Sequence, residues 1–67
     1  MQVEIIREII LENEGKICFT IEPTDLVEKS KVYYGVEYSV TAEELNDLDT
    51  LRNNAINEAI NEFNKYL

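Results

Sequence analysis

The stretch KVYYGVEYSV, residues 31–40, decides the class of fold, because its apolar side chains recur at every second position. The alternating apolar residues are Val32, Tyr34, Val36, Tyr38 and Val40. Side chains two residues apart lie on the same face of a β-strand, so this spacing predicts a strand with one wholly apolar face. Such a strand needs neighbouring strands for its backbone hydrogen bonds and a second layer to cover its apolar face.

The preceding segment REIILENEGKICFTIE, residues 7–22, predicts a β-hairpin that supplies neighbouring strands. Residues 13–15 form its loop, in which Gly15 takes the left-handed position of a type I turn with a bulge. This loop sets a register that pairs Glu12 with Lys16 and Ile10 with Cys18. One face then carries Ile5, Ile9, Leu11, Ile17, Phe19 and Ile21, interrupted by Arg7. The other face carries Glu4, Ile6, Glu8, Ile10, Cys18 and Thr20.

Residues 3–12 have a second interpretation, as an amphipathic helix with Val3, Ile6, Ile9 and Ile10 on its apolar side. Gly15 would then be the residue that ends the helix. We prefer the strand, because half of the first ten residues are β-branched and because a hairpin gives residues 31–40 a sheet to join. Both interpretations remain open at this point.

The segment TAEELNDLD, residues 41–49, has the composition of a helix start, with Thr41 or Asn46 as N-cap and several carboxylates for the first turn. A helix is expected from there to near Leu67. Its apolar stripe is Leu48, Leu51, Ala55, Ile56, Ala59, Ile60, Phe63 and Leu67. Residues 1–67 therefore predict a single α+β domain of the order β-β-β-α, in which a three-stranded antiparallel sheet has one C-terminal helix packed on one face.

The same helix carries the asparagine-rich stretch NNAINEAINEFN, residues 53–64. Asparagine is a poor helix former, but its cost is tolerable where tertiary packing holds the helix. Helical spacing places the asparagines opposite the apolar stripe, so we expect them to face solvent. The alternative is that this uncharged amide face, with Asn57 and Asn61 at its centre, docks a partner.

Charge and composition exclude several classes of function. Fourteen acidic against six basic residues give a net charge of -8, which disfavours direct binding to nucleic acid or to an anionic membrane surface. Glu4 and Glu8 interrupt the apolar N-terminal segment, so we expect no signal peptide and no membrane span, and we place the chain in the cytoplasm. The single cysteine, Cys18, lies in an apolar run and is expected to be a structural thiol.

No residue pattern in the chain points to an enzyme, a metal site or a cofactor site. There is no histidine, which is the commonest general base. The acidic run EELNDLD, residues 43–49, lacks the central glycine and the twelfth-position glutamate of an EF-hand loop, so its carboxylates are expected to favour the helix start. We therefore expect a non-catalytic protein that binds neither metal nor cofactor.

One helix covers only one face of a sheet, and the predicted register leaves apolar residues on the other face. Ile6, Ile10, Cys18 and Tyr33 lie there among acidic residues and threonine. A contiguous apolar patch on a small protein is typical of an interface, so we expect this face to bind a protein partner or a second copy of the chain in a homo-oligomer. The acidity supports an alternative, an acidic inhibitor or DNA mimic acting against a host nuclease or defence complex.

The order REIILENEGKICFTI, VYYGVEYSV, an acidic turn and a helix that begins DLDTLRNNAINEAI resembles the layout of small acidic phage-encoded accessory proteins. In those proteins a hairpin rich in threonine or valine, a strand and an acidic helix follow in the same order. The resemblance implies an accessory role in a phage or prophage and carries no functional residue to this chain. The hairpin here has glutamate and isoleucine where those hairpins have more threonine.

Overall fold

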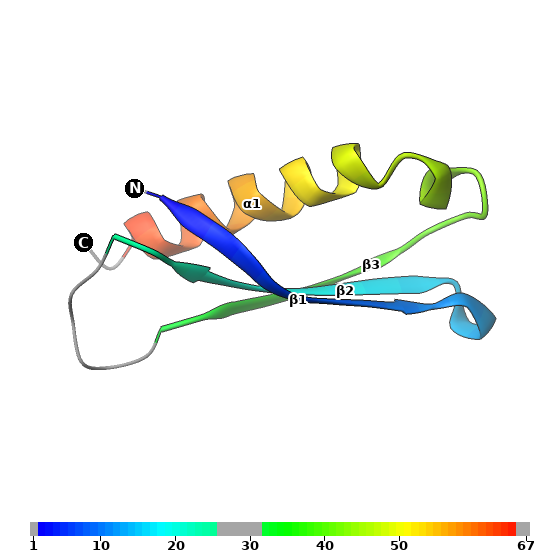
Figure 1. Ribbon diagram of the computed structural model, residues 1–67, viewed down its shortest axis with the longest axis horizontal. Helices are drawn as coiled ribbons and strands as arrows, with labels where there is room; N and C mark the ends of the chain where they lie inside the picture. The colour runs from blue at the N-terminus through cyan, green and yellow to red at the C-terminus, as the bar shows by residue number, and fades with distance from the viewer. Residues whose placement is uncertain (1, 26–31, 66–67) are drawn as a thin grey trace.

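The computed structural model describes residues 2–25 and 32–65, so the predicted core position of Leu67 lies outside the described residues. Its elements are β1 (Val3–Leu11), the 3-10 turn η1 (Glu12–Glu14), β2 (Lys16–Pro23), β3 (Tyr34–Ser39), the 3-10 turn η2 (Glu44–Asn46) and α1 (Leu48–Asn64). The strands form one antiparallel sheet in the order β1-β2-β3, and α1 lies across one face of it (Figure 1). The predicted α+β fold is confirmed, and residues 3–11 form a strand rather than a helix.

The hairpin register predicted from the sequence is wrong by one residue. Four residues connect the strands, because η1 is followed by Gly15, which has a φ of 62° and donates its N–H to the Glu12 carbonyl at 3.1 Å. Leu11 therefore pairs with Lys16 and Ile10 with Ile17. The 3-10 turn with Gly15, which is closed by its own backbone hydrogen bond, is one residue longer than the predicted three-residue loop. The extra residue puts every β1 side chain near the turn on the face opposite to the predicted one.

A β-bulge at Ile6 restores the predicted face in the first part of β1. The register shifts between Ile5 and Arg7, so that Ile5 lies opposite Ile21. An extra residue in one strand reverses the side-chain alternation beyond it. Glu8, which lies between the bulge and the turn, is therefore opposite Phe19 on the helix-covered side.

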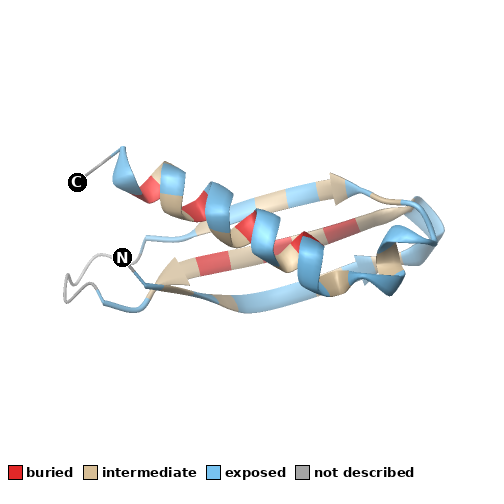
Figure 2. Cartoon of the chain, turned by 90° about the horizontal axis from the view of Figure 1, so that it is seen from above, coloured by how far each residue is buried: buried red, intermediate tan, exposed pale blue. Residues whose placement is uncertain are grey.

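The core lies between the central strand and α1. Its buried residues are Ile17, Phe19 and Ile21 from β2, and Leu51, Ala55, Ala59 and Phe63 from α1. Figure 2 shows the buried positions of the helix and of the central strand facing one another. Ala55 and Ala59, which have no side-chain atoms beyond Cβ, are completely buried between α1 and the sheet. Phe19 also packs edge-on against Tyr38, with ring centroids 6.2 Å apart. The predicted apolar face is confirmed for Tyr34, Val36, Tyr38 and Val40, which pack against the core. Val32 precedes β3 and is 42% exposed, so its predicted place on this face is wrong.

Two successive caps lead into α1, and the helix N-cap is neither of the two residues predicted from the sequence. Thr41 caps the turn before the helix: its hydroxyl accepts from the Glu44 N–H at 3.2 Å, and the Glu44 carboxylate accepts from the Thr41 N–H at 3.0 Å. Asp47 is the N-cap of α1, with its carboxylate accepting from the Thr50 N–H at 3.4 Å and from the Thr50 hydroxyl at 2.7 Å. Thr41 bonds to the turn that precedes the helix, so Asp47, the residue next to the helix start, is the N-cap.

The molecule is long for its size. Its principal extents are 38 × 17 × 16 Å and its radius of gyration is 12.8 Å, whereas a compact chain of this length has a radius of gyration of about 11 Å. An elongated shape leaves a larger share of the chain at the surface. Much of the sheet is therefore close to solvent.

Candidate interaction surface

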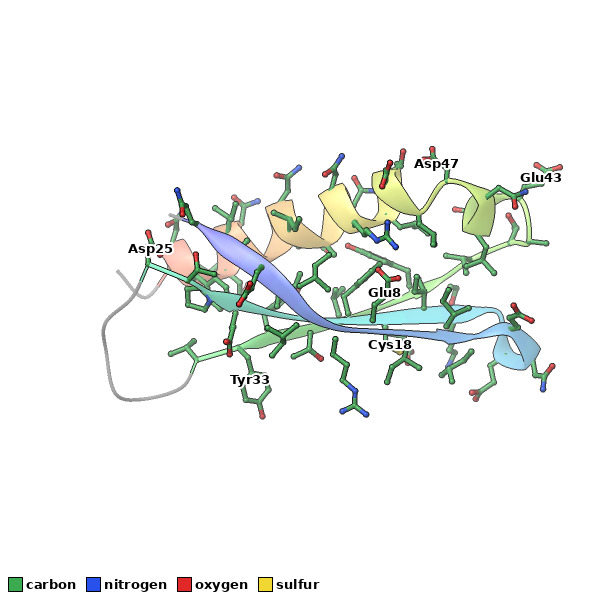
Figure 3. The ribbon with its side chains drawn as sticks, in the orientation of Figure 1. Glu8, Cys18, Asp25, Tyr33, Glu43 and Asp47 are labelled. Carbon is green, nitrogen blue, oxygen red and sulfur yellow. The ribbon has the colours of Figure 1, made fainter. Side chains whose placement is uncertain are left out.

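The face of the sheet away from α1 is covered by no described element, and we call it the open face. The pairing and strand alternation place on it Glu4, Arg7, Ile9 and Leu11 of β1, Lys16, Cys18, Thr20 and Glu22 of β2, and Tyr33, Gly35, Glu37 and Ser39 in or beside β3. Figure 3 shows Cys18 and Tyr33 on this side and Glu8 on the side of α1. The open face is therefore a surface that the described fold leaves to a partner.

Its apolar part differs from the predicted set because of the register. Ile9 lies directly opposite Cys18, and Leu11 is the next β1 residue on the same face. All three are half-buried at the surface of the sheet. The predicted register had placed Ile9 and Leu11 on the covered face, and the one-residue shift moves both to the open face and moves Ile10 to the side of α1.

The four sheet residues that were predicted to bind a partner fall into three places. Cys18 and the 68% exposed Tyr33 lie on the open face. Ile10 lies on the side of α1, opposite Ile17, although 39% of it is exposed, and its predicted place on the uncovered face is wrong. Ile6 is in the bulge and 48% exposed.

Asn57 and Asn61 make a separate surface on α1. Both are exposed, as are Asn53, Asn54 and Asn64, which confirms that the asparagines face solvent. The buried stripe of α1 lies on the opposite side of the helix. These amides therefore share no surface with Cys18 or Tyr33.

The open face carries both signs of charge in a strongly acidic protein. Arg7 and Lys16 lie among the carboxylates of Glu4, Glu22 and Glu37. Lys16 and Glu37 form an ion pair across β2 and β3, with Nζ 3.5 Å from a carboxylate oxygen. Most of the net charge of -8 therefore lies elsewhere on the molecule.

The Cys18 thiol on this face is held in its protonated form. Partial burial raises its pKa, and the hydrogen bond that Sγ donates to the Glu37 carboxylate at 3.6 Å raises it further. The thiolate is the nucleophilic form of cysteine, so these surroundings suppress reactivity at neutral pH. Cys18 contributes apolar surface here.

Two polar contacts between the sheet and α1 were not anticipated from the sequence. Glu8 and Arg52 form a two-pronged ion pair, with Nε to Oε1 at 2.7 Å and Nη2 to Oε2 at 3.0 Å, and Arg52 also contacts Asp49 at 3.3 Å. The hydrogen bond from Arg52 is the main cause that lowers the pKa of Glu8. The Tyr38 hydroxyl donates to the Glu58 carboxylate, and burial is the main cause that raises the pKa of Tyr38. The one sequence feature that could have indicated the ion pair is Arg52, the single basic residue within the acidic and asparagine-rich sequence of α1.

Both 3-10 turns lie at the same end of the molecule (Figure 1), and both contain acidic residues. The Val40 N–H donates to the Gly15 carbonyl at 2.8 Å and joins the end of β3 to the hairpin turn. We call this end the acidic pole; its carboxylates are those of Glu12, Glu14, Glu43, Glu44, Asp47 and Asp49. Within residues 2–25 and 32–65, no three acidic, thiol or imidazole side chains come together in a group that could hold a metal ion.

None of the helices in the described part of the chain has the length and apolar composition needed to cross a membrane. Comparisons with protein-family models, with curated proteins and with solved structures found no match to this chain.

Proposed function

We propose that this protein is a non-catalytic binding module that contacts a protein partner, including a second copy of itself, through the open face and the sheet edge beside it. The observation that carries the proposal is that the described helix covers one face of the sheet while Ile9, Leu11 and Cys18 form an apolar strip on the other. Two basic and three acidic residues flank this strip, and a polar, charged rim is usual around a protein interface. An accessory role in a phage or prophage, as the sequence resemblance implies, fits such a module.

The charge distribution favours protein over nucleic acid as the partner. A phosphate backbone is bound by clustered Lys and Arg, whereas Arg7 and Lys16 on the open face lie among three carboxylates. Tyr33 is the one tyrosine on this face within the described residues, because Tyr34 and Tyr38 pack toward the core. Base stacking needs aromatic rings amid basic residues, and this surface does not combine them.

The test is affinity capture with purified, tagged protein and two matched variants. Ile9→Lys places a charge in the apolar strip, and Asn57→Lys places the same charge on the exposed side of α1. We expect a partner that is captured by the original chain and by Asn57→Lys but is lost with Ile9→Lys. Loss with Asn57→Lys alone would move the binding site to the asparagine face, and equal capture by all three would contradict the proposal.

The acidic pole favours one further candidate, an acidic inhibitor that enters the basic groove of a DNA-binding enzyme. Its carboxylates come from two segments that are far apart in the sequence, residues 12–14 and 43–49, and the fold brings both segments to one end. Inhibition of a nuclease by this end should be competitive with DNA and should disappear in about 0.5 M salt, where charges are screened within a few ångströms. Inhibition that survives that salt concentration would exclude electrostatic mimicry.

A further inference from the structure

The outer edge of β3 has backbone groups with no partner among the described residues. The Val40 N–H bonds to the Gly15 carbonyl, and hydrogen-bonded pairs recur at every second residue of an antiparallel ladder. Tyr38, Val36 and Tyr34 therefore bond to β2, and Gly35, Glu37 and Ser39 direct their N–H and C=O groups outward. No strand of the described chain lies on that side of β3.

The opposite edge of the sheet is protected, and this edge is not. The bulge at Ile6 breaks the regular ladder of β1 and re-orients its outer edge, which is one of the ways in which proteins prevent strands from pairing with other chains. β3 has neither a bulge nor a proline, and it pairs with β2 in unbroken register from Tyr34 to Ser39. Its outer edge is a regular template for one more strand.

Gly35, in the middle of this edge strand, has no explanation within the described chain. Its φ is not positive, and a Cβ atom built on it would meet nothing within 4 Å. Glycine inside a strand costs roughly 0.5–1 kcal/mol relative to alanine, and it often marks a place where another chain approaches closely. The neighbouring Val32 and Tyr33 are 42% and 68% exposed, so apolar surface also gathers at the start of this strand.

We propose that β3 pairs antiparallel with β3 of a second copy, about a two-fold axis beside Val36, to give a continuous six-stranded sheet. This inference rests on the proposed binding function and names its partner and its edge. In this register Val36 lies opposite Val36 of the second copy, and Gly35 lies opposite Glu37. Tyr34 lies opposite Tyr38, and the exposed Tyr33 lies opposite Ser39.

Three considerations together select this register. Residues that direct their backbone groups outward must meet one another, which excludes every register shifted by a single residue. A register centred on Glu37 would place two carboxylates directly opposite each other, which is unfavourable in a sheet. The register centred on Val36 pairs all of β3 from Tyr34 onward and gives the Glu37 side chain the space that Gly35 leaves.

The pairing also explains why β3 is only partly covered by its own helix. Tyr34, Val36 and Tyr38 are half-buried on the α1 side, and the same three side chains of the second copy would lie beside them. A two-fold axis perpendicular to the sheet puts both helices on one side and both open faces on the other. Two apolar strips would then be presented together to a further partner.

Amide hydrogen exchange of the unmodified chain tests the edge directly. We expect the N–H groups of Gly35, Glu37 and Ser39 to become protected as protein concentration rises, because only the second copy bonds to them. The amides of Val36 and Tyr38, which bond to β2, are the internal reference. Fast exchange of the three outward amides at concentrations where sedimentation shows a dimer would overturn the proposal.

A second test compares a positive with a negative side chain at position 35. The two variants should change the dissociation constant of the dimer in opposite directions, which a general loss of folding would not do. Gly35→Lys would face Glu37 of the second copy twice per dimer and should lower the dissociation constant about fivefold, whereas Gly35→Glu should raise it about fivefold. Thr20→Lys and Thr20→Glu are the controls, because Thr20 pairs with Gly35 but lies one strand away from the edge. If Gly35→Lys and Gly35→Glu changed the dissociation constant in the same direction and to the same extent, the proposed register would be wrong.

The two proposals fail in different ways. Self-association that is lost with Ile9→Lys and unaffected at position 35 would overturn the edge pairing and support the open face. A chain that stays monomeric at every concentration would overturn the second copy as partner, while capture of a different protein through Ile9 would still support the binding function. Loss of both signals would overturn both proposals.

Discussion

Gly15 and Gly35 show how two glycines in one small domain have different roles. Gly15 has a φ of 62°, and a Cβ there would lie 3.4 Å from the Val40 carbonyl oxygen. Gly35 has ordinary strand geometry and open space around it. Only the first glycine is required by the conformation of the single chain.

Gly15→Ala should therefore destabilise the protein by about 1–2 kcal/mol, the cost of a left-handed conformation for a residue with a Cβ atom. Gly35→Ala should leave the stability of the monomer unchanged or raise it slightly, because alanine restricts the unfolded chain more than glycine. Urea unfolding of the two variants, at a concentration where the chain is monomeric, measures the difference. Equal losses of stability would show that Gly35 also has a role within the chain.

The Glu8–Arg52 ion pair makes stability depend on pH in a defined direction. Arg52 lowers the pKa of Glu8 below its ordinary value of 4.5 in the folded state. A carboxylate with a depressed pKa stabilises the fold at every pH above its unfolded pKa, and this contribution disappears as the pH falls through the folded pKa. Both side chains are partly open to solvent, so the effect is small and weakens with salt.

Glu8→Gln should therefore lower the urea midpoint at pH 7 and have no effect at a pH below the folded pKa, where Glu8 is already protonated. Glu4→Gln is the matched control, because Glu4 lies on the open face and forms no ion pair with another described residue. Unfolding curves of both variants at the two pH values measure the difference. An equal loss for Glu8→Gln at both pH values would mean that packing, and not charge, explains the contact.

Among the elements, α1 has one side that packs against the sheet and one side that is exposed to solvent. Leu51, Ala55, Ala59 and Phe63 are buried at helical spacing, and the asparagines of the same turns are exposed. The positions that touch the sheet are therefore limited by volume, and the exposed positions are limited only by helix propensity.

Ala59→Leu should destabilise the fold by about 1–3 kcal/mol, because the added side chain has no space between α1 and the sheet. Asn57→Ala combined with Asn61→Ala should instead raise stability by up to about 1 kcal/mol, since alanine is the better helix former at exposed positions. Thermal unfolding of the two variants gives the comparison. A loss of stability from the double alanine variant would show that the amides make contacts within the fold.

The β1–β2 hairpin explains why the sequence predicted the strands but not their register. β1 contains Ile5 and Ile6, and then Ile9 and Ile10, so apolar residues lie on both of its faces. A strand with this pattern fits a buried face in either register, and the pattern cannot choose between them. The extra residue of the turn and the bulge at Ile6 made the choice, and they brought Glu8 rather than Arg7 to the side of α1.

For the molecule as a whole, the net charge of -8 gives the β3 pairing and the acidic pole opposite responses to salt. Two copies of an acidic chain repel each other, so screening by salt should strengthen pairing through β3. Attraction between the acidic pole and a basic groove has the opposite dependence, because salt screens the attraction.

Sedimentation velocity across a salt series should therefore show a dimer dissociation constant that falls as salt rises. Inhibition through the acidic pole, measured in the same series, should weaken. A dimer that dissociates in salt would indicate that ion pairs, and not backbone pairing at the β3 edge, hold the two copies together.

Local pattern was enough to predict β3, the helix with its apolar stripe and the left-handed Gly15, because each of these depends on neighbours within a few residues, whereas the periodicity of residues 3–12 fitted both a strand and a helix. Only the folded structure decided the hairpin register, the ion pair between Glu8 and Arg52, and the place of Ile9 and Leu11 on the open face. The four-residue turn shifts the pairing of β1 by one residue, and the bulge at Ile6 reverses that shift in the first part of the strand. Because β1 has apolar residues on both faces, its own pattern does not choose between them, and the turn and the bulge decide which face lies under α1.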